Sequence, residues 1–108
     1  MRNILLAILL LSLAGAVQAK GNAEKGKAKA AQVCAACHGA DGAKPVAPEN
    51  PILAGQYPDY LVKALSDYKS GKRANPIMKA FAEQLSKQDI EDLAAWFSMQ
   101  KSDLHFQR

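Results

Sequence analysis

Side chains able to bind a cofactor covalently lie close together in Cys34-Ala35-Ala36-Cys37-His38. Two thiols about one helical turn apart can add to the two vinyl groups on one side of a haem. A histidine directly after the second thiol is then held beneath the iron. This spacing predicts one haem c attached through Cys34 and Cys37, with His38 as an axial ligand.

Three other uses of a Cys-x-x-Cys pair fit the rest of the sequence less well. A redox-active dithiol of the thioredoxin type needs a βαβ setting, and we find no strand pattern. A structural zinc site needs about four Cys or His ligands, and beyond the motif the sequence offers only His105. A plain disulfide between Cys34 and Cys37 leaves His38 unexplained. Haem attachment is therefore the favoured interpretation.

The candidates for a second axial ligand are Met78, Met99 and His105. Met78 directly follows Asn75-Pro76-Ile77, a segment that we expect to form a loop stiffened by proline. Met99 lies beyond the buried stripe of the last predicted helix, where a methionine more often fills a gap in the core. His105 lies in a polar terminus. We expect Met78 to be the ligand, and a thioether in the sixth position argues against substrate chemistry at the iron.

Helical patterns account for most of the chain between residues 22 and 101. Asn22 is an expected N-cap for a helix from residue 23 to about 36, and Ser86 for the last helix, with Asp89 in a capping box. Pro58 suits the first turn of a helix that ends at Ser70-Gly71, and a short helix is expected around 79–85. Residues 39–55 and 72–76 are predicted loops. The predicted fold class is all-α.

The first nineteen residues have the pattern of an export signal. A positive start at Arg2 precedes an apolar run over 4–13, and small residues end at Ala19. The apolar run is too short to span a bilayer, which needs about 20 residues. We expect residues 1–19 to be cleaved and residues 20–108 to form one domain in the periplasm. So small an exported domain usually needs a disulfide, a metal or a cofactor for stability, and a large apolar cofactor would supply the missing core.

The balance of charges limits the classes of partner. The chain has 14 basic and 10 acidic residues, a formal net charge of +4. The lysines are spread along the sequence and are not interleaved with aromatic residues, which argues against nucleic-acid binding. A mildly basic surface is compatible with docking on acidic redox proteins. We expect a monomer without a membrane span in the mature form.

Beyond the haem motif, several segments carry a family resemblance. They are Pro51-Ile52-Leu53-Ala54-Gly55-Gln56-Tyr57, Tyr60-Leu61, Tyr68-Lys69-Ser70-Gly71-Lys72-Arg73, Asn75-Pro76-Ile77-Met78, Leu85-Ser86-Lys87-Gln88-Asp89-Ile90 and Leu93-Ala94-Ala95-Trp96. With these the sequence resembles class I c-type cytochromes of the short bacterial cytochrome c553 type, and is similar to one half of the dihaem cytochrome c4 proteins. Only one haem motif is present, so we expect a monohaem protein. The resemblance implies a fold whose N- and C-terminal helices cross closely. Gly26 would stand at that crossing, facing Leu93 and Trp96.

The resemblance also implies roles for residues around the haem. Pro51 would offer its carbonyl oxygen to the Nδ1–H of His38, fixing the orientation of the imidazole. Leu53 would pack on the haem face. Tyr57 and Arg73 are candidates to reach the haem propionates.

These features predict a periplasmic one-electron carrier rather than an enzyme. One alternative is an electron-entry subunit of a membrane oxidase or dehydrogenase. Another is a haem enzyme or gas sensor with an open sixth position, although the sequence offers no distal His and Arg pair for peroxide cleavage. The sequence does not identify the electron donor or acceptor.

Overall fold

The computed structural model describes residues 21–102. Within that range the chain forms helices and loops, with no strand. The helices are α1 (Ala23–Val33), α2 (Ala35–His38), α3 (Pro58–Ser70), α4 (Pro76–Ala82) and α5 (Lys87–Ser98). The all-α prediction is confirmed. The predictions for residues 1–19 and for His105 lie outside the described residues.

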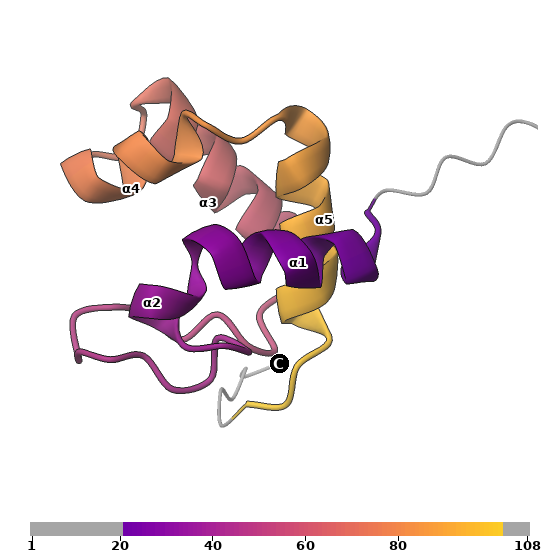
Figure 1. The fold of residues 1–108 in the computed structure, drawn as a ribbon. Coiled ribbons are helices and arrows are strands. Elements are labelled where there is room, and N and C mark those ends of the chain that lie inside the picture. The colour runs from indigo at the N-terminus through magenta and orange to yellow at the C-terminus, as the bar shows by residue number, and fades with distance from the viewer. Residues whose placement is uncertain (1–20, 103–108) are drawn as a thin grey trace, which may run out of the picture.

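The first and last of these helices cross in close contact (Figure 1). A Cβ atom added at Gly26 would collide with the main-chain carbonyl of Asp92 and would lie 3.0 Å from Trp96 Cβ. Asp92 itself is buried, and its Oδ1 accepts a hydrogen bond from the Asn22 amide at 2.8 Å. Gly26 therefore stands at the predicted crossing and meets Trp96 as expected, although its nearest neighbour is Asp92 rather than Leu93.

The helix ends follow from capping residues that the sequence indicates. Asn22 Oδ1 accepts a hydrogen bond from Lys25 N at 3.0 Å at the start of α1. Pro58 occupies the first turn of α3, and Gly71 ends this helix in the left-handed conformation, with φ of 86°. Ser86 and Asp89 form the predicted capping box at the start of α5.

Two helix boundaries differ from the prediction. The expected first helix is interrupted, because α1 ends at Val33 and a turn at Cys34 separates it from the short α2. The fourth helix begins at Pro76 rather than near residue 79. A proline fits the first helical position because its missing N–H needs no partner there, and Asn75 caps this turn. Met78 therefore lies in a helix instead of a loop.

The core is small and lies where α1, α3 and α5 meet. Its buried cluster consists of Ala30, Leu61, Leu85, Ile90, Leu93, Ala94 and Phe97. The predicted buried stripe of α5 is confirmed by Ile90, Leu93, Ala94 and Phe97, and Trp96 packs at its flank. Met99 is the C-cap of α5 and is 68% exposed, so it does not fill the core.

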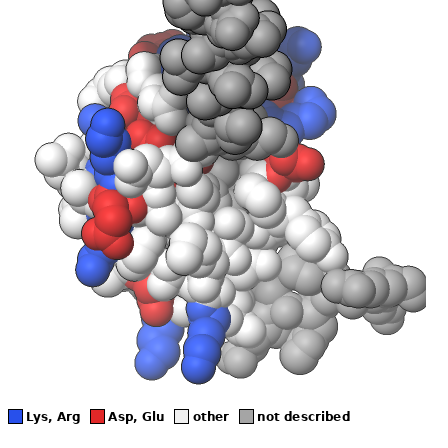
Figure 2. All heavy atoms as spheres, turned by 90° about the vertical axis from the view of Figure 1, so that its right-hand side faces the viewer, with Lys and Arg blue, Asp and Glu red and all other residues white. Residues whose placement is uncertain are grey.

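Charged side chains are mixed on the face that includes the beginning of α1. Figure 2 shows basic and acidic groups near one another around the edge of this face, with uncharged surface between them. The mixture agrees with the scattered lysines of the sequence. Among residues 21–102, no helix has both the length and the apolar character needed to cross a membrane.

Candidate cofactor site

A cavity of about 640 Å³ opens between α2, α3, α4 and the loop at residues 49–56. Its volume is in the range of cofactor pockets, about 300–1,000 Å³. Figure 1 shows α2 and α4 on the same side of the molecule, well separated from each other. Cys34, Cys37, His38 and Met78 all line this cavity. The fold thus brings together the four residues predicted to attach and ligate a haem.

His38 is held by a hydrogen bond on one ring nitrogen. Its side chain is 7% exposed, and Nδ1 lies 2.9 Å from the carbonyl oxygen of Pro51. Since a carbonyl can only accept, Nδ1 carries the proton and donates it, which leaves the Nε2 lone pair available to a metal. This is the atom pair that the resemblance implied for Pro51.

The two cysteines have different surroundings. Cys34 is half-buried and Cys37 is exposed. Burial raises the pKa of the Cys34 thiol to about 11, because desolvation disfavours the thiolate. The Cys37 carbonyl accepts hydrogen bonds from Val46 N and Asn50 Nδ2, each at 3.1 Å, which tie the following loop to the motif.

Met78 is fixed in the first turn of α4. Its amide donates to Asn75 Oδ1 at 3.0 Å, and the side chain is half-buried at the cavity. The neighbouring Ile77 is 68% exposed. Among the described residues, Met99 is not one of those that line the cavity.

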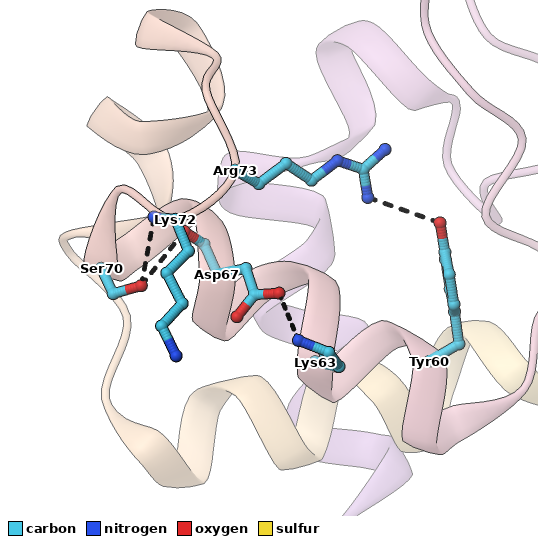
Figure 3. Close-up of polar contacts among 6 residues, drawn as sticks. All are labelled: Tyr60, Lys63, Asp67, Ser70, Lys72 and Arg73. Carbon is cyan, nitrogen blue, oxygen red and sulfur yellow. Dashed lines mark hydrogen bonds and ion pairs between the residues drawn. The ribbon is translucent and has the colours of Figure 1, made fainter.

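Arg73 spans two tyrosines of α3 at the cavity. Its Nη1 donates to the Tyr60 hydroxyl at 3.4 Å, as drawn in Figure 3, and its guanidinium lies 4.7 Å from the centre of the Tyr68 ring. The hydrogen bond with Tyr60 is the main cause of a raised pKa of Arg73. All three residues line the cavity. Arg73 therefore places a permanent positive charge at its edge.

Among residues 21–102, those that line the cavity do not include Tyr57. Tyr57 is the N-cap of α3 and its ring is 49% exposed, whereas Tyr60 and Tyr68 line the cavity. Tyr60 and Tyr68 lie on the same face as Leu61 and Leu65, so their helical spacing could have identified them. Leu53 lines the cavity as expected.

The side chains of this cavity suit a haem. Two thiols lie on consecutive turns, and a neutral imidazole nitrogen and a thioether line the same space. The other lining groups are mainly apolar, and include Val33, Leu53, Leu61, Leu65, Phe81, Leu85, Leu93 and Phe97. A haem macrocycle is apolar, and His with Met is an established ligand pair for its iron. The donor set and the lining therefore fit the group.

Comparison with known proteins identifies the family. The cytochrome c family profile matches residues 23–100, and the chain belongs to this family. It is 50% identical to cytochrome c4 of Pseudomonas aeruginosa over 102 residues, covering 94% of this chain and 50% of that protein. It is 36% identical to cytochrome c-553 of Helicobacter pylori, covering 89% of this chain and 95% of that one.

Comparison with solved structures leads to the same family. The crystal structure of reduced recombinant cytochrome c4 from Pseudomonas stutzeri superposes with a TM-score of 0.70 at 44% identity, covering 78% of this chain and 48% of that one. The chain spans about half the length of the cytochrome c4 proteins that it matches. The resemblance to class I cytochromes and to one half of cytochrome c4 is confirmed. The chain carries covalently bound haem c, attached through Cys34 and Cys37, and its family works in electron transfer.

Proposed function

We propose that this chain is a periplasmic one-electron carrier in which His38 Nε2 and Met78 Sδ are the axial ligands. The observation that carries the proposal is the cavity shared by the two cysteines, His38 and Met78, with His38 Nδ1 already engaged by Pro51 O. A bound haem supplies an iron that gains and loses one electron. Redox proteins serve as donor and acceptor.

The residues around the cavity keep the ligands in place when the charge of the site changes. The Pro51 carbonyl holds the His38 ring in one tautomer, and the first turn of α4 holds the Met78 main chain. Fixed ligands on both faces reduce the rearrangement that accompanies each transfer. The apolar lining excludes water, which also raises the reduction potential.

Substitution of the sixth ligand tests the assignment. In Met78→Ala, loss of the thioether should lower the reduction potential by on the order of 0.1 V or more and let carbon monoxide bind the ferrous protein. Met99→Ala removes an exposed methionine and serves as the matched control. Redox titration and absorption spectra of the holoproteins measure both effects, and wild type should be low-spin in both oxidation states.

Two results would contradict the proposal. If Met99→Ala, rather than Met78→Ala, abolishes the weak methionine–iron charge-transfer band, the sixth ligand is Met99. If wild-type ferrous protein is high-spin and binds carbon monoxide, the sixth position is open and the chain belongs with ligand-binding haem proteins.

Export predicts a specific N-terminus for the haem protein. Cleavage after Ala19 would leave Lys20 as the first residue of the haem protein. N-terminal sequencing of the haem protein from a periplasmic fraction should begin at Lys20. A sequence that begins within residues 1–19 would contradict this processing.

A further inference from the structure

Asn75 is the N-cap of α4, the helix that carries Met78. Its backbone is extended, with φ of −163° and ψ of 106°, as expected for an N-cap residue that precedes a proline. Its side-chain oxygen accepts from Met78 N at 3.0 Å, and its carbonyl accepts from Lys79 N at 2.8 Å. Asn75 thus fixes the start of α4 with two hydrogen bonds, one of them to the amide of the proposed ligand.

This start position sets how the side chains of the first turn are directed relative to the cavity, which both Ile77 and Met78 line. Successive residues of an α-helix are rotated by about 100°. A shift of the helix start by one residue would therefore turn the Met78 side chain by about this angle, away from its present direction. Pro76 limits the first helical residue by its fixed φ, but it has no N–H and cannot bond to the cap. The Asn75 side chain is consequently the group that ties the Met78 amide to the helix start.

We infer that Asn75 is a positioning residue, whose side-chain cap keeps the Met78 thioether directed at the haem iron. The inference rests on the proposed His38 and Met78 ligation. Without the cap, the first turn of α4 opens more often, and an external ligand competes more effectively for the sixth position. Asn75 itself lines the cavity, but its side-chain hydrogen bond is to the main chain of Met78. A small residue able to accept the same hydrogen bond should therefore replace it.

Imidazole binding to the ferric holoprotein tests this inference, because it reports how often Met78 leaves the iron. Loss of one N-cap hydrogen bond in Asn75→Ala should tighten apparent imidazole binding about five-fold and weaken the charge-transfer band. Asn75→Ser, which retains a cap acceptor, should bind imidazole about as wild type does.

Asn22→Ala is the matched control. Asn22 caps α1 by the same type of bond, from Lys25 N to Oδ1 at 3.0 Å, and it is not among the residues that line the cavity in the described part of the chain. Both alanine variants should lower the folding equilibrium constant about five-fold. Only Asn75→Ala should change imidazole binding and the charge-transfer band.

Several outcomes would overturn the inference. It fails if Asn75→Ala binds imidazole as wild type does, or if Asn22→Ala shows the same increase, which would indicate general loss of stability. It also fails if Asn75→Ser behaves like Asn75→Ala. Met78→Ala distinguishes failure of the Asn75 role from failure of the ligand assignment. If this variant keeps the charge-transfer band, Met78 is not the ligand.

Discussion

The Asp89 carboxylate closes the first turn of α5 by local hydrogen bonds. Its Oδ2 accepts from Ser86 N at 2.9 Å, and Ser86 Oγ accepts from Asp89 N at 2.9 Å. The hydrogen bond from the Ser86 main chain is the main cause of a lowered pKa of Asp89, and the Ser86 side chain, Lys29 and Lys69 lower it further. A group whose folded-state pKa lies below its unfolded value stabilises the fold most when it is ionised.

Asp89→Asn should therefore show a stability loss that depends on pH. The loss should be about 0.5 kcal/mol at pH 7, where the charge interacts with the helix N-terminus. The wild-type advantage is fully present above the unfolded value near 3.8 and disappears as the pH falls through the lowered pKa.

Denaturant unfolding of the two holoproteins between pH 7 and pH 3 measures this difference, since acid effects on the haem are common to both. Ser86→Ala, which removes one partner of the carboxylate, is the companion variant. A difference between wild type and Asp89→Asn that stays constant over this pH range would show that the charge has no part in it.

At the level of elements, the crossing of α1 and α5 leaves no room for a side chain at residue 26. The obstacle is the main-chain carbonyl of Asp92, which cannot rotate away as a flexible side chain would. The buried Asp92 carboxylate also accepts hydrogen bonds from Asn22 N and Gln88 Nε2, each at 2.8 Å. These contacts fix the relative position of the two helices.

Gly26→Ala should accordingly destabilise the holoprotein although alanine favours helices. Overpacking of a close contact costs about 1–3 kcal/mol, and here it opposes a propensity gain of about 1 kcal/mol. Because the obstacle is main chain, we expect the upper end of this cost and hence a net loss of about 2 kcal/mol in the free energy of unfolding, measured by guanidinium titration. Lys25→Ala, on an exposed position of the same helix, should change it by less than about 0.5 kcal/mol. A Gly26→Ala protein as stable as wild type would contradict the close crossing.

On the scale of the whole molecule, the cavity is large compared with the core. The buried cluster contains few large side chains, and the cavity of about 640 Å³ adjoins Leu61, Leu85, Leu93 and Phe97. At about 24 cal/mol per Å³, an enclosed void of this size would cost about 15 kcal/mol, which is an upper bound for a cavity that opens to solvent. The whole free energy of unfolding of a typical small domain is only about 5–15 kcal/mol.

Removal of the haem should therefore unfold the chain. After chemical cleavage of both thioether bonds, we expect most helical circular dichroism and the cooperative thermal transition to disappear. Holoprotein taken through the same steps without the cleaving reagent is the control. A haem-free chain that keeps a cooperative transition and a native near-ultraviolet signal from Trp96 would contradict this expectation.

Local signals predicted the parts of the fold that depend on neighbours in sequence. The capping residues Asn22 and Ser86 gave correct helix starts, and the C-x-x-C-H spacing predicted the attachment site. The first turn of α4 was missed because Pro76 indicates either a loop or a helix start. The helix begins at Pro76 because the Asn75 side chain caps that turn.

Contacts between distant residues could not be predicted in the same way. Tyr57 begins α3 and is not among the described residues that line the cavity, whereas Tyr60 lines it, and contact of Tyr57 with a propionate stays a prediction. Arg73 reaches Tyr60 across a turn whose shape depends on Gly71 and on the hydrogen bond from Arg73 N to Asp67 O at 3.1 Å. The Asp92 tether to Asn22 joins residues 70 positions apart, which no local pattern reveals.

The hydrogen bond between Asn22 and Asp92 can form only after almost the whole domain has been synthesised. A chain that emerges with its N-terminal side first presents Cys34 and Cys37 well before Asp92 has been synthesised. Until α5 arrives, α1 has no partner at Gly26, and the cavity has no wall at Leu93 and Phe97. Both thiols should therefore stay accessible until α5 packs against α1 and completes the cavity wall.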